Sequence, residues 1–197
     1  MSDSAKKFMS ISVWITIVLF VIRCLIDSSG IAFAINQREY LNCSYSIYGY
    51  AGEAIGATAI FMAVFNKWLW KKKPFYLLTG ELPVLAKHYK GTITFVWDGV
   101  EQTRNSEIWI DQTFLNVSVK LGTNESTSNS ITASIEKVNS EQELIYTYLN
   151  TPRAELQNRS AIHYGTAMLC VDDSKKISGT CYTSRLTRGS MMFQAVE

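Results

Sequence analysis

The distribution of hydrophobic and polar positions divides the chain into two parts. The sequence is almost continuously apolar over Phe8–Ile26 and again over Tyr48–Trp70, whereas the rest of the chain alternates between apolar and polar residues over short stretches. An apolar run of about 20 residues spans a bilayer as an α-helix, and alternation is typical of half-buried β-strands. The pattern therefore predicts a two-helix transmembrane hairpin over residues 1–73, a linker over 74–85 and an all-β unit over 86–197.

Basic residues flank the outer ends of the predicted hairpin. Lys6 and Lys7 precede the first apolar run and three lysines follow the second, while Arg38 is the one Lys or Arg in the connecting segment. Because cytoplasmic loops are enriched in Lys and Arg, we expect both termini to lie in the cytoplasm. A signal peptide is the alternative interpretation of the first run, since a basic start precedes such peptides too.

Two ionisable residues and two glycines interrupt the apolar runs. Arg23, near the end of the first run, and Glu53, near the start of the second, would lie at similar depth because the helices run in opposite directions. They either contact each other, within or between chains, or each reaches toward the nearby interface. Gly52 and Gly56 share one helical face and would let a second helix approach closely. That helix is either the first one of the same chain or a helix of another copy.

The all-β unit contains eight alternating segments, separated by turn-like sequences such as Asp98-Gly99 and Thr151-Pro152. Eight short strands are typical of a small, closed antiparallel barrel that holds side chains or one small ligand. The predicted strands are Tyr89–Trp97, Glu107–Gln112, Leu115–Leu121, Ser126–Val138, Glu143–Asn150, Ser160–Val171, Ile177–Ser184 and Gly189–Val196.

Alternation also assigns residues to the inside of this barrel. The interior is predicted to be apolar along most of its length, for example at Phe95 and Trp97, and to become polar toward one mouth. The polar positions of this cup are Gln112, Tyr148, Thr183 and Arg185. In the alternative interpretation Tyr148 and Arg185 point outward as ordinary surface residues.

The sequence contains no pattern typical of catalysis or metal binding. Its two histidines, His88 and His163, are far apart, and neither a G-x-S-x-G elbow, a glycine-rich phosphate loop nor a C-x-x-C pair is present. A net charge of +2 is too small for a general nucleic-acid binder. We therefore expect a protein that is not an enzyme, that needs no cofactor or metal and that binds neither DNA nor RNA.

The order of these features resembles the membrane effectors of bacterial cyclic-oligonucleotide antiphage signalling (CBASS), in particular the two-transmembrane β-barrel type, the CD-NTase-associated protein fifteen family. The resemblance covers nearly the whole chain. The stretches that carry it are Gln112-x-Phe114, Leu121-x-Thr123, Ser126–Ser130, Tyr146-x-Tyr148-x-Asn150-x-Pro152, His163-x-Gly165 and Gly179–Gly189.

This resemblance implies a function as well as a fold. The barrel would bind a cyclic nucleotide, here a cyclic dinucleotide, that a partner CD-NTase nucleotidyltransferase makes. Binding would lead to homo-oligomerisation of the membrane segment in the bacterial inner membrane, disruption of that membrane and death of the infected cell. The residues expected to act in oligomerisation and in the membrane are Arg23, Gly52, Glu53 and Gly56.

The resemblance also implies roles for residues near the C-terminus. Arg185, followed by Arg188, would meet phosphates, because the planar guanidinium can pair with two phosphate oxygens at once. Threonine hydroxyls would donate hydrogen bonds, and tyrosine rings would stack on bases. The candidate ligand-binding residues are thus Gln112, Tyr148, Tyr182, Thr183, Arg185 and Thr187. Tyr182 and Thr183 are neighbours on one strand, so their side chains should face opposite sides of the sheet.

Two other functions remain open from the sequence. The chain could be a membrane-anchored carrier of an apolar ligand, because Gly91–Trp97 resembles the first strand of the lipocalin fold. It could also be a non-enzymatic adaptor whose barrel binds another protein. The carrier would have an apolar cup, and its arginines from Arg185 to Arg188 would be ordinary surface residues.

Overall fold

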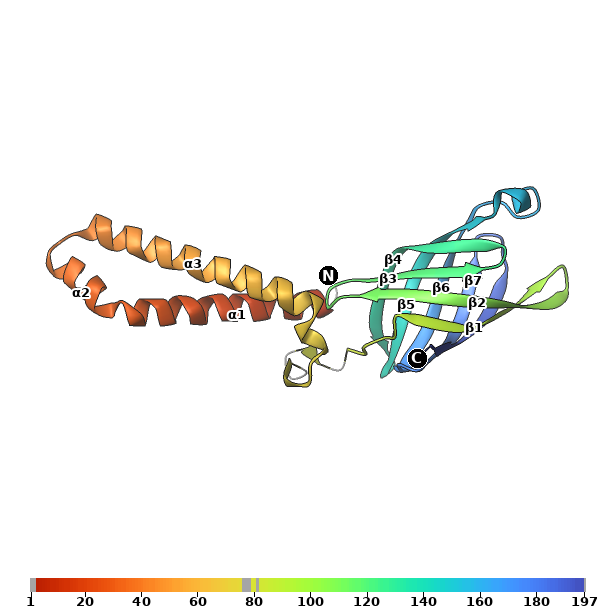
Figure 1. Cartoon of the computed structure of the whole chain (residues 1–197), viewed down its shortest axis with the longest axis horizontal. Helices are drawn as coiled ribbons and strands as arrows, with labels where there is room; N and C mark the ends of the chain where they lie inside the picture. The colour runs from red at the N-terminus through yellow and green to blue at the C-terminus, as the bar shows by residue number, and fades with distance from the viewer. Residues whose placement is uncertain (1–2, 76–78, 81, 197) are drawn as a thin grey trace. The chain divides into compact units, whose positions relative to one another are not determined.

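The computed structural model describes residues 3–75, 79–80 and 82–196 (Figure 1). The chain forms two compact units, Met1–Gly80 and Glu81–Glu197. The bounds of the predicted linker over 74–85 stay a prediction, because residues 76–78 and 81 of it lie outside the described residues.

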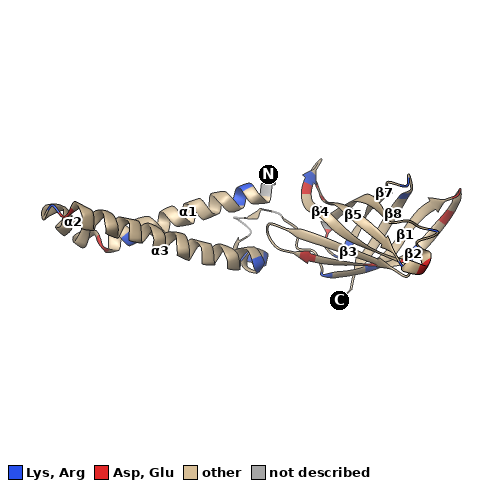
Figure 2. Cartoon of the chain, turned by 90° about the horizontal axis from the view of Figure 1, so that it is seen from above, with Lys and Arg blue, Asp and Glu red and all other residues tan. Residues whose placement is uncertain are grey.

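The first unit is a helical hairpin. Two long helices, α1 (Asp3–Ile26) and α3 (Tyr40–Lys67), lie side by side, and the short helix α2 (Ser28–Asn36) connects them. Two single 3₁₀ turns, η1 (Leu69–Lys71) and η2 (Lys73–Phe75), follow α3. Both α1 and α3 are long and apolar enough to cross a membrane. Charged residues are scarce along them, and lysines gather where α1 begins and α3 ends (Figure 2).

One face of α3 packs against α1 in steps of one helical turn. Its buried residues include Tyr50, Ala54, Thr58 and Met62. The Thr16 hydroxyl donates a hydrogen bond of 3.0 Å to the Thr58 hydroxyl across this contact. A polar side chain within a membrane helix is stabilised when another helix supplies its partner. This hydrogen bond therefore helps to fix the pairing of α1 with α3.

Of the alternatives left open for Arg23 and Glu53, the structure shows a contact within one chain. The Arg23 Nε donates to the Glu53 Oε2 at 2.9 Å, and the guanidinium also lies over the Tyr50 ring. Gly52 and Gly56, by contrast, do not lie against α1, since a Cβ atom added at either would meet nothing within 4 Å. The close approach that these two glycines permit is not used by α1 of the same chain.

The second unit is a closed barrel in which each strand pairs antiparallel with the next and β8 pairs with β1. The predicted fold class, two apolar helices followed by an eight-stranded antiparallel barrel, is confirmed. The strands are β1 (His88–Trp97), β2 (Val100–Gln112), β3 (Val117–Thr123), β4 (Ser126–Val138), β5 (Glu141–Pro152), β6 (His163–Asp173), β7 (Lys176–Thr183) and β8 (Arg188–Ala195).

Turn chemistry fixes the register of two hairpins. Asp98 and Gly99 both have positive φ, which is what a two-residue type I′ turn requires, and Trp97 pairs directly with Val100. Asn139 and Ser140 form the equivalent turn between β4 and β5. The first six residues of β2 pair with β1 alone, because the pairing of β2 with β3 begins at Ser106. The β1–β2 hairpin therefore extends past β3 and forms part of one rim of the barrel (Figure 1).

The barrel has two different ends. We call the mouth the end at which the odd-numbered strands finish and the even-numbered strands begin, and the base the opposite end. Between them the interior is filled by apolar side chains that are fully buried, among them Ile108, Leu144, Leu169, Val171 and Ile177.

Gln112 belongs to the base and not to the mouth. Its amide accepts a hydrogen bond from the backbone N–H of Leu85 at 3.0 Å and donates one to the Pro83 carbonyl at 2.9 Å. Alternation places Gln112 inside the barrel, as predicted, but β2 runs opposite to β5 and β7. The last residue of β2 therefore lies at the other end from the last residues of those strands, and the structure does not group Gln112 with Tyr148, Thr183 and Arg185.

Candidate ligand-binding site at the mouth of the barrel

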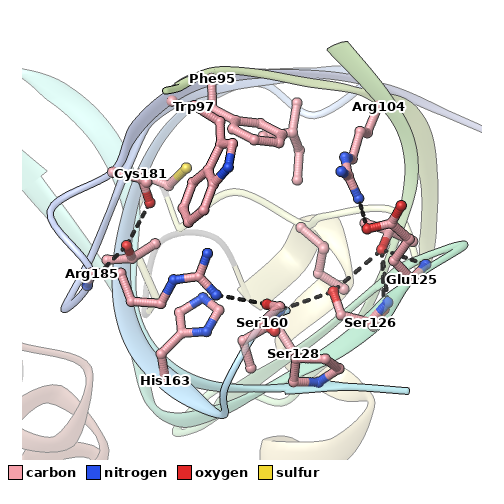
Figure 3. Close-up of a pocket in the computed structure, with 18 of the residues that line it drawn as sticks. Phe95, Trp97, Arg104, Glu125, Ser126, Ser128, Ser160, His163, Cys181 and Arg185 are labelled. Atoms are coloured by element: carbon pink, nitrogen blue, oxygen red, sulfur yellow. Dashed lines mark hydrogen bonds and ion pairs between the residues drawn. The ribbon is translucent and has the colours of Figure 1, made fainter. Parts of the chain in front are cut away.

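A cavity of about 400 Å³ opens at the mouth. Its lining combines apolar and aromatic side chains with polar and basic ones (Figure 3). Small-molecule sites have volumes of roughly 300–1,000 Å³ and combine apolar walls with a few convergent polar groups. Floor residues include Ile93, Leu121, Tyr146, Tyr148, Cys181 and Met191, and rim residues include Trp97, Arg104, Glu125, Asn150, Arg159, Ser160, Thr183, Arg185, Thr187 and Arg188.

Two tyrosines from β5 form the deepest polar groups of the cavity. The rings of Tyr146 and Tyr148 lie 5.8 Å apart between centroids, and burial raises the pKa of both phenols. The Tyr146 side chain is only 2% exposed, and its hydroxyl has no hydrogen-bond partner among the described residues. A buried hydroxyl without a partner is unfavourable, so a ligand atom that reaches the floor would gain a neutral hydrogen-bonding partner there.

Gly165 leaves room for the Tyr148 ring. Gly165 lies opposite Tyr148 in the β5–β6 pairing, and a Cβ atom at this position would collide with the Tyr148 ring. The absence of a side chain at residue 165 lets the phenol lie flat over β6 and line the cavity. This is a steric reason for the His163-x-Gly165 sequence at the start of that strand.

The β7–β8 turn presents Arg185 to the cavity. The Thr183 and Thr187 hydroxyls hydrogen-bond to each other at 2.6 Å, and the Thr183 N–H donates to the Thr187 carbonyl. Leu186 takes the positive φ that the turn needs. The turn thereby holds both threonines and the arginine on the cavity side of the rim.

Arg185 itself is held by two contacts. Its guanidinium carbon lies 4.6 Å from the centroid of the Trp97 ring, and its Nη1 donates a hydrogen bond of 2.6 Å to the Ser160 hydroxyl (Figure 3). Ser160 lies in the loop between β5 and β6, so Arg185 links this loop to the β1–β2 hairpin. Neither contact neutralises the guanidinium, which keeps its charge available to an anion.

The opposite side of the rim carries an ionic network centred on Glu125, in the turn between β3 and β4. Its carboxylate accepts hydrogen bonds from Arg104 of β2 and from Arg159 of the β5–β6 loop, the latter at 3.2 Å. Arg104 foremost, and then Arg159, holds the pKa of Glu125 below its usual range. Glu125 is therefore ionised at neutral pH.

Beside this network lies an uncharged polar cluster. The Asn150 amide donates hydrogen bonds to the Ser126 and Ser128 hydroxyls at 3.1 and 2.8 Å. All three residues line the cavity, and hydroxyls and amides of this kind can bind the edges of bases or sugar hydroxyls.

Arginine is concentrated at the mouth. Residues 82–196 contain five arginines, and four of them line the cavity: Arg104, Arg159, Arg185 and Arg188. Among the described residues, no carboxylate pairs with Arg185 or Arg188. The Arg185 guanidinium is therefore free to pair with anionic oxygens, which its planar shape favours. Arg188 lies at the edge of the mouth and pairs with Tyr182 in the sheet, so it shares the outer face of that residue.

The structure brings together most, but not all, of the candidate ligand-binding residues. Thr183, Arg185, Thr187 and Tyr148 line the cavity. Tyr182 does not, because it lies on the outer face of β7 and is 47% exposed. Strand parity, which already set Tyr182 and Thr183 on opposite sides, accounts for this.

Sequence reasoning missed several residues of the rim. Arg104 was missed because the predicted strand began only at Glu107, although Arg104 and Ile108 have the same parity on β2. Extending the alternation by a few residues would have found it. Glu125 and Arg159 lie in connections between strands, where no periodic pattern indicates which way a side chain points.

The chain thus combines two apolar helices with a closed β-barrel whose mouth holds an arginine-rich cavity. Residues 81–195 match the family model described as Cap15, cyclic dinucleotide receptor domain. The chain is also 26% identical, over the full length of both proteins, to the CD-NTase-associated protein 15 of Staphylococcus schleiferi. The chain therefore belongs to the Cap15 family, and its barrel is a cyclic dinucleotide receptor domain.

This membership confirms the resemblance to CBASS effectors of the two-helix β-barrel type. Together with the two apolar helices, it indicates association with a membrane. The match to a receptor domain also favours the receptor over the lipocalin-like carrier and the adaptor.

Proposed function

We propose that the cavity at the mouth of the barrel binds a cyclic dinucleotide messenger, and that binding makes the protein an effector of antiphage defence. The observation that carries this proposal is the presence of Arg185 and Arg188 on a cavity of suitable size without a carboxylate partner among the described residues. A cyclic dinucleotide carries two phosphodiesters, each with one negative charge. The free Arg185 guanidinium supports the binding of one of them, and Arg188 lies beside it at the edge of the mouth.

The other residues of the cavity supply contacts to bases and sugars. The rings of Trp97 and Tyr148 offer stacking surfaces, and base–aromatic stacking contributes about 1–3 kcal/mol per base. Thr183 and Thr187 offer hydroxyls, and the Tyr146 hydroxyl can bond a ligand atom at the floor. Gln112 and Tyr182 are not part of this proposed site, since the first lies at the base and the second on the outer face.

The messenger would come from a nucleotidyltransferase. The relative in Staphylococcus schleiferi is named for its association with a CD-NTase. We infer that a CD-NTase is also the functional partner of this chain and makes the cyclic dinucleotide that its barrel binds.

The output would be homo-oligomerisation of the helices in the bacterial inner membrane, with both termini in the cytoplasm, followed by disruption of the membrane and death of the infected cell. Gly52 and Gly56 support this proposal, because they leave a face of α3 open to a helix of another copy. The Arg23–Glu53 pair lies between α1 and α3 of the same chain, and a charged pair in an apolar medium would be sensitive to a rearrangement of these helices on oligomerisation.

Binding can be tested on the full chain in detergent micelles, with a panel of cyclic dinucleotides that covers all base combinations. We expect at least one member to bind and to raise the melting temperature. Arg185→Ala should weaken that binding by at least tenfold, because a buried or rim arginine–phosphate pair contributes more than about 1.4 kcal/mol. Its melting temperature without ligand should stay close to that of the wild type.

Arg153→Ala is the matched control. Arg153 is an exposed arginine at the same end of the barrel, but it does not line the cavity. Its loss should leave affinity within about twofold, as is usual for surface substitutions. A folded wild-type protein that binds no cyclic dinucleotide, or equal losses in both variants, would contradict the proposed site.

A further inference from the structure

Glu125 is the one carboxylate among the described residues that line the cavity, where it faces four arginines. It lies on the rim opposite Arg185, and both of its oxygens accept hydrogen bonds from guanidinium groups (Figure 3). A site built only to attract anions would gain nothing from an acidic residue at this position. The presence of Glu125 therefore calls for a reason other than phosphate binding.

Glu125 divides the basic rim into two unequal sides. On the β7–β8 side, Arg185 and Arg188 have no carboxylate partner among the described part of the chain. On the other side, Arg104 and Arg159 are already paired with Glu125. The four arginines and Glu125 together carry a net charge of +3, so the carboxylate cancels one of the four positive charges and occupies two of the guanidinium groups.

We infer that Glu125 is a charge-selective specificity determinant, which keeps Arg104 and Arg159 from ligand phosphates and so favours doubly charged cyclic dinucleotides over more highly charged nucleotides. This inference rests on the proposed binding of a cyclic dinucleotide in the cavity. The disfavoured ligands are nucleoside triphosphates and linear dinucleotides with a terminal phosphate.

The physical reason is a difference in charge at a similar size. A terminal phosphate carries about −1.5 to −2 charges, whereas a phosphodiester carries one. Glu125 lowers the charge of its side of the rim from +2 to +1, so each extra negative charge of a ligand is attracted less strongly there than it would be by two unpaired guanidinium groups. Discrimination between ligands commonly uses a repulsive element, here the Glu125 carboxylate, in addition to attractive contacts.

The direct alternative is that Glu125 recognises a base. A carboxylate can accept two hydrogen bonds at once from adjacent donors, and guanine presents two such donors on its Watson–Crick edge. This alternative predicts that removing the carboxylate weakens the binding of guanine-containing dinucleotides. The inferred charge selection predicts that removing it strengthens the binding of highly charged nucleotides whatever their bases.

The test measures three ligands on the full chain in detergent micelles: the best cyclic dinucleotide of the panel, the linear dinucleotide of the same bases with a 5′-phosphate, and ATP. Glu125→Gln should raise the affinity for ATP and the linear dinucleotide by about tenfold, the effect of one unit charge near a protein surface. Binding of the cyclic dinucleotide should change by less than about threefold. Glu125→Asp keeps the charge and should keep most of the wild-type selectivity.

Glu101→Gln controls for the change in net charge. Glu101 is an exposed residue of the β1–β2 hairpin near the mouth and does not line the cavity. Its substitution changes the total charge by the same amount as Glu125→Gln, so it should leave the selectivity among the three ligands unchanged.

The variant Arg159→Gln tests whether Glu125→Gln acts by releasing a paired arginine or only by changing the net charge. Arg159→Gln should have little effect on ATP binding in the wild type, where Arg159 is paired, but should reverse much of the gain in the Glu125→Gln protein. This non-additivity is the signature of two residues that act on the same ligand through one contact. It also remains measurable if Glu125→Gln alone lowers the melting temperature.

The outcomes distinguish this inference from the function on which it rests. If the folded wild type binds no cyclic dinucleotide, the proposed function fails. If it binds one, but Glu125→Gln and Glu101→Gln change all three ligands by equal factors, the charge selection alone is overturned. Weaker binding of guanine-containing dinucleotides only would assign Glu125 to base recognition and would likewise overturn it.

Discussion

The helical hairpin and the barrel use the same kind of ion pair in opposite surroundings. In the hairpin, Arg23 and Glu53 pair between two helices whose other side chains are mostly apolar and exposed. In the barrel, Glu125 pairs with Arg104 and Arg159 at a rim where all three side chains are partly exposed. Within a bilayer, an unpaired charge is costly, so the Arg23–Glu53 pair is needed for stability. A partly exposed ion pair contributes little to stability, so the pairs of Glu125 can act in ligand selectivity instead.

The largest effect is therefore expected in the hairpin. Arg23→Ala or Glu53→Ala should leave an unpaired charge between the helices, at a cost of about 2–3 kcal/mol if the position lies within the hydrocarbon. The yield of folded protein in membranes and its melting temperature in detergent should both fall. The double variant Arg23→Glu/Glu53→Arg should recover most of the lost yield and melting temperature. If its melting temperature is as low as that of the single variants, the ion pair is not the source of the stability.

A second large effect is expected at the base of the barrel. Gln112→Ala removes the partner of the Leu85 N–H and of the Pro83 carbonyl, and buried groups left without a partner cost about 1–3 kcal/mol. Chemical unfolding of the full chain should register this loss of stability. Affinity for a cyclic dinucleotide should stay within about twofold, because Gln112 lies at the opposite end from the cavity. A strong loss of affinity at unchanged stability would return Gln112 to the ligand site.

A smaller effect is expected from acid at the mouth. Because Arg104 holds the folded-state pKa of Glu125 below the usual value of about 4.3, this carboxylate contributes stability that is fully present above that value. The contribution is lost as the pH falls through the lowered folded-state pKa. The melting-temperature difference between wild type and Glu125→Gln should therefore be constant from pH 7 to about 5 and shrink below about pH 4. A difference that grows toward acid pH would contradict the ion pair.

The smallest effect is expected on the outer face of the barrel. Tyr182→Ala should change ligand affinity by less than about twofold, because its ring points away from the cavity. Tyr148→Ala, a change of the same size at a residue that lines the cavity, should weaken binding by about tenfold through lost stacking. Calorimetric titration of both variants with the same cyclic dinucleotide would measure the two losses. A larger loss for Tyr182→Ala than for Tyr148→Ala would contradict these positions.

Most of the fold could be predicted from the sequence because its signals are periodic. The apolar runs around Arg23 and Glu53 have the length of a membrane span, and both helices are present. Alternation located all eight strands and assigned Phe95, Trp97 and Tyr148 to the cavity side. The additional helix α2 was not predicted, since the connecting segment carries no clear pattern.

The candidate site could be predicted only in part, for reasons that particular residues make clear. Thr183, Arg185 and Thr187 lie close together in the chain, so a local motif was enough to group them. Gln112 was grouped with them by parity alone, but parity gives the side of a sheet and not the end of a barrel. Arg104, Glu125 and Arg159 come from three separate segments, and their contacts exist only once the strands have closed.

The sequence by itself determined what each segment is, because helix length, strand alternation and turn residues such as Asp98-Gly99 act over a few neighbouring positions. Only the tertiary structure decided which end of the barrel each side chain reaches and which charges meet there. Neighbouring strands of the barrel run in opposite directions, so successive strands end at opposite ends of the barrel. Folding brings the Arg159 Nη2 within 3.2 Å of the Glu125 Oε1, although the two residues are 34 positions apart in the chain. Long-range ion pairs of this kind depend on register and closure, which no local pattern encodes.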